Sequence, residues 1–376
     1  MERTAAIDRL LQEKKYDAFM IHDDSSSSRD LYYLSGFEAS DPFTYLRTDG
    51  KSILVVSQLE FSRAREESRV DEVLKTSELS GEGNVFDNLA EEFGIEVLAV
   101  PGDFPLGMAE EMDTCVEAVE SDVVMEDRKV KSRKEQQKLR KAQEATEKAM
   151  EKAEKLLKRA DVRDRVLYLD GRPLTSERLR SLIKIHLIEN GCEVPEETIV
   201  SSGRESAKPH ATGEGLIKSG EPVVVDIFPR KDNYFGDMTR TFVKGNADEE
   251  VQDMKEAVLE AQKAAFQMLE REKEVKACDV HREVCEVLEE HGYSTLRDED
   301  TEKGFIHSTG HAVGLDLHEK PVLAENEDVI LPGMVLTIEP GLYLPETGGV
   351  RIEDMVLVTE EGYENFNSMS KDLELD

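Results

Sequence analysis

Two aspartates lie within otherwise apolar and aromatic stretches of the chain, and their positions predict a metal site. Asp226 lies in residues 223–228 and Asp237 in residues 234–243. The two stretches flank residues 230–233, which predicts an antiparallel hairpin with a four-residue loop. In that register Asp226 lies directly opposite Asp237, with Cβ atoms roughly 5 Å apart. Like charges placed there destabilise a sheet unless a cation binds between them. The alternative is an Asp226 bonded to backbone at a strand end and a solvated Asp237.

A second acidic pair repeats this pattern later in the chain. Glu339 ends the apolar segment 335–339, and Glu353 lies within the apolar segment 350–358. Each pair follows two predicted helices, so we expect two helix–helix–hairpin halves. If the halves face each other about a pseudo-twofold axis, the four carboxylates converge in one cleft. Burying an unpaired charge costs several kcal/mol, so the sequence predicts two divalent cations among these carboxylates.

Four of the eight histidines are candidate site residues: three lie within residues 305–319, between the two acidic pairs, and one lies just ahead of the first pair. His307, His311 and His318 lie among glycines and small residues, which let the backbone approach a ligand closely. One or two of the three can be structural, but packing alone explains such a cluster poorly. His210, in the loop before the first hairpin, is left open as either a functional or a surface residue.

The elements that must position these residues divide the chain into two predicted domains. Residues 1–125 alternate helix-like and strand-like segments, which predicts a small α/β domain. No metal-like cluster is apparent in that part of the sequence. Residues 126–376 carry all of the candidate residues named above. The helices of this second domain are predicted at residues 128–159, 175–190, 249–271 and 279–291.

Composition narrows the class of protein. At 376 residues and 39% hydrophobic content, the chain is long and apolar enough for a large folded core. The four cysteines are too scattered for a structural zinc site or a disulfide framework. No apolar run approaches the ~20 residues of a membrane span, and the N-terminus opens an amphipathic helix rather than a signal peptide. We therefore expect a soluble, cytoplasmic protein that does not bind membranes.

The charge balance is strongly acidic. A formal net charge of −34 repels the phosphate groups of nucleic acids. A nucleic acid partner is therefore not expected. High salt screens the self-repulsion of an acidic chain. An acidic, halophilic adaptation is therefore our hypothesis for this composition.

The order and spacing of the motifs resemble those of one enzyme family. Residues 33–37 read Tyr-Leu-Ser-Gly-Phe, which is similar to a motif in the N-terminal domain of that family. Together with the acidic and histidine positions above, they make the chain resemble the pita-bread metallopeptidases, most closely the aminopeptidase P and prolidase group that cleaves Xaa-Pro bonds. The resemblance implies an α+β fold with a pita-bread (creatinase/aminopeptidase-like) C-terminal catalytic domain at 126–376 and a smaller α/β N-terminal domain at 1–125. It also implies a homodimer in which the N-terminal domain covers the partner's active site.

The resemblance further implies a dinuclear metal centre. Asp226 and Asp237 would hold one ion, while Asp237, His311, Glu339 and Glu353 complete the other, with Asp237 and Glu353 bridging. Manganese or cobalt is the usual activating ion of the group and zinc is an alternative; an oxygen-rich ligand set favours manganese. A water bridging the ions is expected to lose its proton and attack the scissile carbonyl as a metal-bridging hydroxide.

The remaining candidates have roles implied by the same resemblance. Glu339 is similar to the proton shuttle of the family, which takes the proton of the water and passes it to the leaving proline nitrogen. His210, His307 and His318 match positions around the substrate, and His318 resembles the residue that steadies the tetrahedral intermediate. Arg351 resembles a residue that pairs with acidic groups near the metals.

Some residues depart from the family pattern. Phe228 stands where the first metal motif usually has glycine, and Ala312 follows His311 where glycine is common; both bear on the shape of the pocket. Val322 stands where prolidases carry a basic residue that grips the carboxylate of a dipeptide, with Lys320 as a possible substitute. An aminopeptidase is therefore favoured, while an Xaa-Pro dipeptidase stays open. The wider alternatives are a related pita-bread hydrolase with another substrate and a non-catalytic binding module.

Overall fold

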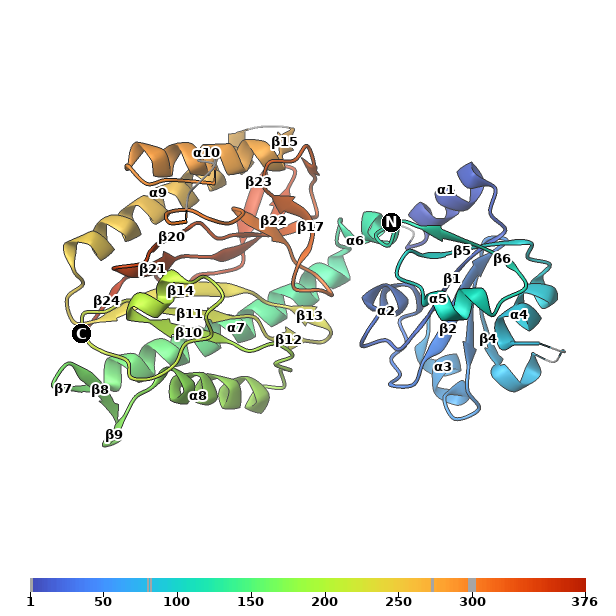
Figure 1. Cartoon of the computed structure of the whole chain (residues 1–376), viewed down its shortest axis with the longest axis horizontal. Coiled ribbons are helices and arrows are strands. Elements are labelled where there is room, and N and C mark those ends of the chain that lie inside the picture. Colours follow the sequence, from blue (N-terminus) through green and yellow to red (C-terminus); the bar gives the residue numbers. More distant parts are fainter. Residues whose placement is uncertain (1–2, 80, 82, 272–273, 297–301) are drawn as a thin grey trace. The chain divides into compact units, whose positions relative to one another are not determined.

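The computed structural model describes residues 3–79, 81, 83–271, 274–296 and 302–376. The chain divides into two compact units, Met1–Arg128 and Lys129–Asp376, whose elements are labelled in Figure 1. Within the described ranges, no helix combines the length and the apolar character that crossing a membrane requires.

The first unit is built on one six-stranded sheet. Its strand order is β4-β3-β2-β1-β5-β6. The strands are β1 (Ala18–Asp23), β2 (Phe43–Thr48), β3 (Lys51–Val56), β4 (Glu72–Lys75), β5 (Val97–Pro101) and β6 (Cys115–Val119). The helices are α1 (Ala5–Lys14), α2 (Arg29–Ser35), α3 (Phe61–Glu67), η1 (Thr76–Glu78), α4 (Val85–Phe93), α5 (Leu106–Glu110) and α6 (Met125–Arg128). The predicted α/β character of this region is confirmed.

The second unit contains two larger sheets. The four-stranded sheet has the order β10-β11-β14-β24 and the five-stranded sheet the order β17-β16-β19-β22-β23. Their strands are β10 (Ile199–Ser202), β11 (Val223–Ile227), β14 (Met238–Lys244), β16 (Gly310–Ala312), β17 (Glu319–Leu323), β19 (Val335–Ile338), β22 (Asp354–Thr359), β23 (Gly362–Asn365) and β24 (Glu374–Leu375). Shorter strands complete the unit: β7 (Asp161–Arg163), β8 (Val166–Leu169), β9 (Arg172–Pro173), β12 (Arg230–Lys231), β13 (Tyr234–Phe235), β15 (Val275–Lys276), β18 (Val329–Ile330), β20 (Gly341–Leu344) and β21 (Gly348–Arg351).

Each of these sheets is covered by its own pair of helices. Helices α7 (Arg133–Arg159) and α8 (Ser176–Glu189) share one apolar core with β10, β11 and β14. Helices α9 (Glu249–Arg271) and α10 (Ala277–Glu290) share another with strands of the second sheet. Figure 1 shows the two larger sheets of this unit between the two helix pairs. The prediction of two halves, each with two helices ahead of its acidic strands, is confirmed, but those strands belong to larger sheets rather than to hairpins alone. A short 3₁₀ turn, η2 (Gly203–Ala207), lies between β10 and β11.

The long charged helix begins later than the predicted residue 128. Ser132 is its N-cap: the Ser132 hydroxyl accepts from the Glu135 N–H, and the Glu135 carboxylate accepts from the Ser132 N–H. This reciprocal capping box satisfies backbone donors that would otherwise be left without partners. Helix α7 therefore starts at Arg133.

The predicted register of the first hairpin is wrong. Asp226 pairs with Thr239, two positions from Asp237. The cause is the turn: Asp232 and Asn233 have φ values of 50° and 72°, so the hairpin closes with two residues rather than four, and β12 pairs directly with β13. Asp and Asn tolerate the left-handed conformation better than most residues. Because side chains alternate with period two, this shift leaves both aspartates on the same face of the hairpin.

The predicted strand over residues 350–358 is also wrong, because it is interrupted at Ile352 and Glu353. Before the break, β21 pairs with β20; after it, β22 pairs with β19. Strand β19 ends at Ile338, directly before Glu339 and Pro340. Proline has no N–H to donate to a sheet and so terminates pairing. Glu339 and Glu353 therefore both lie just outside regular strands.

Candidate metal centre

The nine side chains predicted from the sequence line a single cavity of about 580 Å³ in the second unit. They are Asp226, Asp237, His311, Glu339, Glu353, His210, His307, His318 and Arg351. They come from both halves of the unit, so the cavity lies between the two sheets. Its wall also contains Phe228, Leu317 and Val322, which make part of it apolar.

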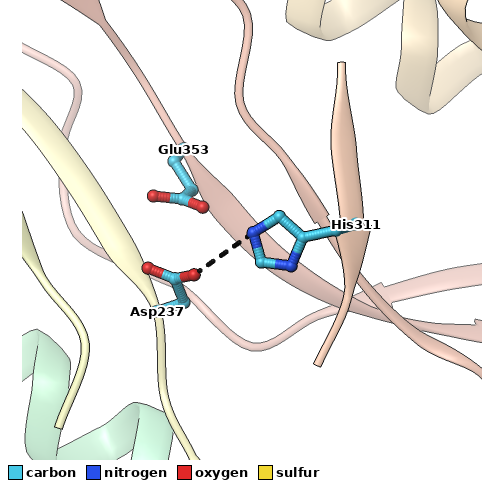
Figure 2. Close-up of side chains that lie close together, drawn as sticks. All are labelled: Asp237, His311 and Glu353. Atoms are coloured by element: carbon cyan, nitrogen blue, oxygen red, sulfur yellow. Dashed lines mark ion pairs between the residues drawn. The ribbon is translucent and has the colours of Figure 1, made fainter. Parts of the chain in front are cut away.

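Three of these residues form a compact donor cluster. Each of Asp237, His311 and Glu353 offers one ligand atom, and these atoms lie within 4.8 Å of one another. Figure 2 shows the three side chains pointing toward one another. The His311 Nε2 atom lies 3.6 Å from Asp237 Oδ2 and 3.5 Å from Glu339 Oε1. Carboxylate oxygens and one imidazole nitrogen are typical ligands of divalent cations.

The protonation state of His311 suits a ligand. Its Nδ1 atom donates to the carbonyl of Ala312 at 3.1 Å, which leaves the Nε2 lone pair facing the carboxylates. Burial and the neighbouring His318 lower the pKa of His311 to about 3. The imidazole is therefore neutral at physiological pH.

Asp226 completes the acidic set at the end of β11. Its Oδ2 atom accepts from Arg351 Nη2 at 2.7 Å. Its Oδ1 atom is buried and has no hydrogen-bond partner among the described residues. A buried oxygen without a partner is costly, and a bound cation at the cavity wall would satisfy it.

The electrostatics of the cavity also fit bound cations. Burial, followed by the charge of Glu353, raises the pKa of Asp237 well above its ordinary range. Burial, followed by the charge of Glu339, does the same to the pKa of Glu353. Burial raises the pKa of Glu339 to about 8. These carboxyls resist ionising together unless positive charge is supplied among them, so the residues present fit divalent metal ions.

Arg351 connects Asp226 to residues on the other side of the cavity. Its Nη1 atom donates to the Tyr343 hydroxyl at 2.7 Å. Because His307 Nδ1 donates to the carbonyl of Ser308, its Nε2 accepts from that same hydroxyl at 2.9 Å. Burial, followed by the charge of Arg351, lowers the pKa of His307 to about 3. His307 is thus held as a neutral acceptor within a hydrogen-bonded chain.

His210 and His318 are exposed residues of the cavity wall. The His318 ring packs edge-on against His311 with 4.4 Å between ring centroids. The loop before His318 is held by Glu319, whose Oε1 accepts from the Leu315 N–H at 2.9 Å. Its Oε2 atom forms a buried ion pair with Lys131 at 3.0 Å.

Sequence reasoning missed two residues of the site. Thr239 Oγ1 donates to Glu353 Oε2 at 2.7 Å and so joins the two halves. Tyr343 bridges Arg351 and His307, as described above. The signal for Thr239 was its position two residues from Asp237, which places both on one strand face. No comparable sequence signal marks Tyr343.

Comparison with known proteins identifies the family. Residues 137–360 match the description "Metallopeptidase family M24". The chain belongs to metallopeptidase family M24. Residues 3–130 match the Creatinase/Prolidase N-terminal domain. The predicted resemblance to the aminopeptidase P and prolidase group, and with it the pita-bread fold, is confirmed.

Individual M24 relatives are similar over nearly their full lengths. An Xaa-Pro dipeptidase from Pyrococcus furiosus is 32% identical, covering 99% of this chain and 99% of the relative. The structure of the prolidase from Pyrococcus horikoshii has a TM-score of 0.82 at 30% identity, covering 99% of this chain and 100% of that chain. The X-Pro aminopeptidase from Thermotoga maritima has a TM-score of 0.81 at 26% identity, covering 98% and 99%.

The wall of this M24 cavity has few positive groups. Among the described lining residues, Arg351 is the one lysine or arginine, and it donates to Asp226, Tyr343 and Thr239. Val322 lines the cavity, whereas Lys320 is not among its lining residues. Among the described lining residues, no second lysine or arginine is therefore available to pair with a free peptide carboxylate.

Proposed function

We propose that this M24 chain is a metal-dependent peptidase that hydrolyses the bond before proline in short peptides. The observation that carries the proposal is the convergence of nine predicted side chains on one cavity, together with the buried Asp226 Oδ1, which has no hydrogen-bond partner among the described residues. The similarity to an Xaa-Pro dipeptidase and to an X-Pro aminopeptidase supports the substrate class.

Five side chains would hold two divalent ions. Asp226 and Asp237 would hold one ion, and Asp237, His311, Glu339 and Glu353 would hold the other, with Asp237 and Glu353 shared. Manganese is the proposed ion, because four of the five ligands are carboxylates; cobalt and zinc are the alternatives. When bound, the ions supply positive charge that lowers the pKa of a water and stabilises the oxyanion of the attacked carbonyl.

The protein side chains would move the protons and orient the substrate. Glu339 receives the proton of the attacking water and delivers it to the proline nitrogen as the bond breaks. Arg351 donates to the Asp226 carboxylate, and the Tyr343 hydroxyl links Arg351 to His307. His210 and His318 contact the substrate from the exposed part of the wall, and the apolar residues Phe228 and Val322 limit access of water to the proline ring.

The lining residues favour peptides longer than dipeptides. The carboxylate of an Xaa-Pro dipeptide would lie close to the cavity wall, where Arg351 is already committed to three partners. Burial of an unpaired carboxylate is costly. An additional residue after proline moves the carboxylate away from the wall, so an aminopeptidase is favoured over a strict dipeptidase.

A substrate panel tests the proposal. Metal-free protein supplemented with Mn²⁺ would be given Ala-Pro, Ala-Pro-Ala and the control Ala-Ala-Ala, and the released amino acids would be quantified. We expect cleavage of both proline peptides, faster for the tripeptide, and none of the control. Cleavage of the control at an equal rate would contradict the Xaa-Pro assignment. Mn²⁺ binding without any cleavage would favour a non-catalytic module.

Three properties of the whole molecule belong to the same proposal. We propose a homodimer, a cytoplasmic location and an adaptation to elevated salt. Three of the four free cysteines are buried, which suits a reducing compartment. Light scattering after gel filtration measures the oligomeric state. Melting temperature against KCl tests the salt hypothesis: the formal charge of −34 predicts a rise as salt screens repulsion, and a flat or falling curve would contradict it.

A further inference from the structure

Arg240, on β14, lies beneath the proposed metal centre and is almost fully buried, with 1% exposure. A guanidinium carries five N–H donors in a planar fork. In this structure all five have acceptors: the carbonyls of Thr239 at 2.9 Å, Glu353 at 2.7 Å, Ser370 at 3.3 Å and Met369 at 3.4 Å, and Asp354 Oδ1 at 2.8 Å. A lysine, with three donors, could not replace this set.

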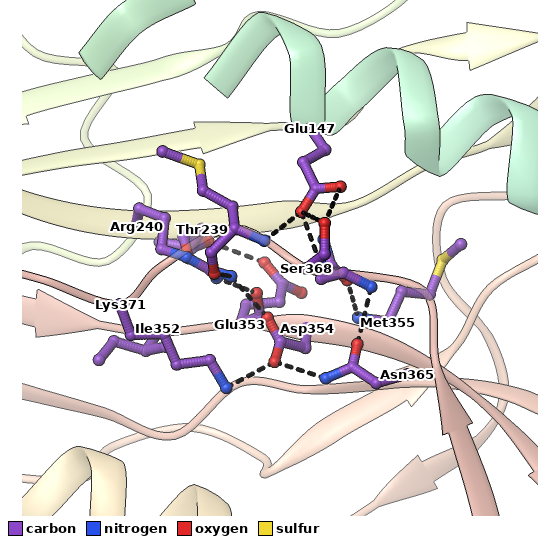
Figure 3. Close-up of polar contacts among 12 residues, drawn as sticks. Glu147, Thr239, Arg240, Ile352, Glu353, Asp354, Met355, Asn365, Ser368 and Lys371 are labelled. Atoms are coloured by element: carbon purple, nitrogen blue, oxygen red, sulfur yellow. Dashed lines mark hydrogen bonds and ion pairs between the residues drawn. The ribbon is translucent and has the colours of Figure 1, made fainter. Parts of the chain in front are cut away.

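Asp354 is the charged partner of Arg240 and is equally enclosed. The side chains of the pair are 2% and 1% exposed. The second Asp354 oxygen, Oδ2, pairs with Lys371 at 2.6 Å and accepts from Asn365 at 2.9 Å. Figure 3 shows these contacts converging on Asp354 from β14, β23 and the C-terminal segment. Both carboxylate oxygens are therefore satisfied by the protein itself.

The neighbouring residue, Glu353, lies in the break between β21 and β22. It has no place in a β-ladder that could hold its backbone. Its N–H donates to the Thr239 carbonyl at 3.1 Å, and its own carbonyl accepts from Arg240. Its side chain accepts from the Thr239 hydroxyl. Contacts with Thr239 and Arg240 thus take the place of the missing ladder.

The two contacts act on opposite faces of β14. Consecutive side chains on a strand point to opposite faces, so Thr239 faces the cavity and Arg240 faces away from it. Arg240 donates to the Glu353 carbonyl and the Asp354 carboxylate, both on the C-terminal side of the Glu353 Cα. It also donates to the Thr239 carbonyl, which accepts the Glu353 N–H on the other side. These contacts fix the Glu353 backbone, and the Thr239 hydroxyl contacts the carboxylate itself.

We propose that Arg240 and Asp354 are positioning residues whose buried ion pair sets the Glu353 carboxylate for metal binding. The inference rests on the proposed function, because it assigns Glu353 to the metal centre. Neither residue lines the cavity. Their effect passes through the backbone of Glu353.

The test compares three variants by Mn²⁺ titration calorimetry of the metal-free, full-length protein. Arg240→Lys keeps the charge opposite Asp354 but loses donors to the carbonyls. Asp354→Asn removes the ion pair and keeps an acceptor oxygen. Lys371→Met is the matched control, because Lys371 pairs with Asp354 Oδ2 and has no hydrogen bond to Glu353 in the described contacts. Circular dichroism gives the melting temperature of each metal-free protein.

We expect Arg240→Lys and Asp354→Asn to weaken Mn²⁺ binding about 10–100-fold, the range for residues that orient metal ligands. Saturating Mn²⁺ should restore part of kcat, with KM for Ala-Pro-Ala unchanged. The Lys371→Met control should lower the melting temperature and leave the Mn²⁺ affinity unchanged. A purely structural pair would lower the melting temperature in all three variants without weakening Mn²⁺ binding in any.

The outcomes separate this inference from the proposed function. Wild-type affinity in folded Arg240→Lys and Asp354→Asn overturns the inference alone, provided that the wild-type protein binds Mn²⁺ and cleaves Ala-Pro-Ala. A wild-type protein that does neither overturns the proposed function first. If neither variant folds, the pair serves the fold as a whole and the positioning role is overturned.

Discussion

Glu353 and Asp354 are adjacent buried acids with opposite electrostatic environments. Burial and the charges of Glu339 and Asp226 raise the pKa of Glu353 well above its ordinary value. Burial alone would also raise the pKa of Asp354, but the charges of Arg240 and Lys371 lower it below its ordinary value. The two pKa values differ in direction because the two carboxylates have different numbers of cationic neighbours. Asp354 has two cationic side chains, whereas the acids of the cavity outnumber Arg351, the one lysine or arginine among its described lining residues.

This contrast separates a structural acid from a binding acid. A buried carboxylate whose charge is neutralised by side chains of the protein needs no external cation and has a structural role. A group of buried carboxylates that the protein leaves under-compensated needs an external cation or must bind protons. The four predictions below test this contrast, from the largest expected effect to the smallest.

Glu339→Gln should give the largest effect, on turnover. The change removes a ligand charge and the proposed proton carrier but keeps the shape of the side chain. We expect kcat with Ala-Pro-Ala and Mn²⁺ to fall by about 10²–10⁴-fold, the range for losing a general acid–base group, with the fold retained by circular dichroism. The control is Glu364→Gln, the same chemical change in an exposed ion pair with Arg140. Near-normal turnover in Glu339→Gln would remove Glu339 from the mechanism.

Asp354→Asn should give the largest loss of stability. It leaves the buried charges of Arg240 and Lys371 without their carboxylate. Breaking a buried pair from one side costs about 3–5 kcal/mol. Urea unfolding with and without Mn²⁺ measures the loss, and Asp170→Asn, in an exposed pair with Arg159, is the control. Equal stability of the two variants would mean that the ion pairs of Asp354 with Arg240 and Lys371 do not stabilise the fold.

Metal removal should destabilise the protein more at alkaline than at acidic pH. The folded-state pKa of Glu339, about 8 without a cation, lies above its ordinary value of 4.5. Folding therefore favours the protonated form, and the stability of the metal-free protein falls as pH rises from about 4.5 to about 8. The change in melting temperature on adding EDTA should be larger at pH 8 than at pH 5.

The cavity acids supply an internal control for that experiment. Asp237→Asn replaces a carboxyl of raised pKa with a neutral group of the same shape. It should therefore weaken Mn²⁺ binding and yet raise the stability of the metal-free protein at pH 8, by about 0.5–2 kcal/mol. A pH-independent effect of EDTA in the wild type, or a less stable metal-free Asp237→Asn, would contradict the picture of under-compensated acids.

The sequence predicted the candidate site better than the local geometry that builds it. Asp226, Asp237, Glu339 and Glu353 were found because charged residues inside apolar segments are unusual. The register of the hairpin that carries Asp226 and Asp237 was not predicted correctly. Its turn length depends on whether particular residues adopt positive φ, as Asp232 and Asn233 do. The error left both aspartates on the same face, since it shifted the register by an even number of residues.

The contacts that join the two halves could not be predicted from the sequence. Arg240 and Thr239 read as ordinary strand residues, and Asp354 as one more acid after Glu353. Their roles depend on a break in the strand at Ile352 and on the long-range approach of β14 to β22. Neither is encoded in a local pattern of hydrophobicity. The helices were predicted more closely because their periodicity is local, as in α9.

Arg204→Ala should have the smallest effect, because its ion pair is the opposite of the Arg240–Asp354 pair in exposure. The Arg204 and Glu346 side chains are 72% and 82% exposed at a separation of 2.8 Å. Water solvates both charges whether or not they are paired, so removing one leaves no buried charge behind. We expect a change within about 0.5 kcal/mol in urea unfolding and no change in Mn²⁺ affinity. A loss of unfolding free energy close to that of Asp354→Asn would contradict the conclusion that burial determines the cost of breaking an ion pair in this protein.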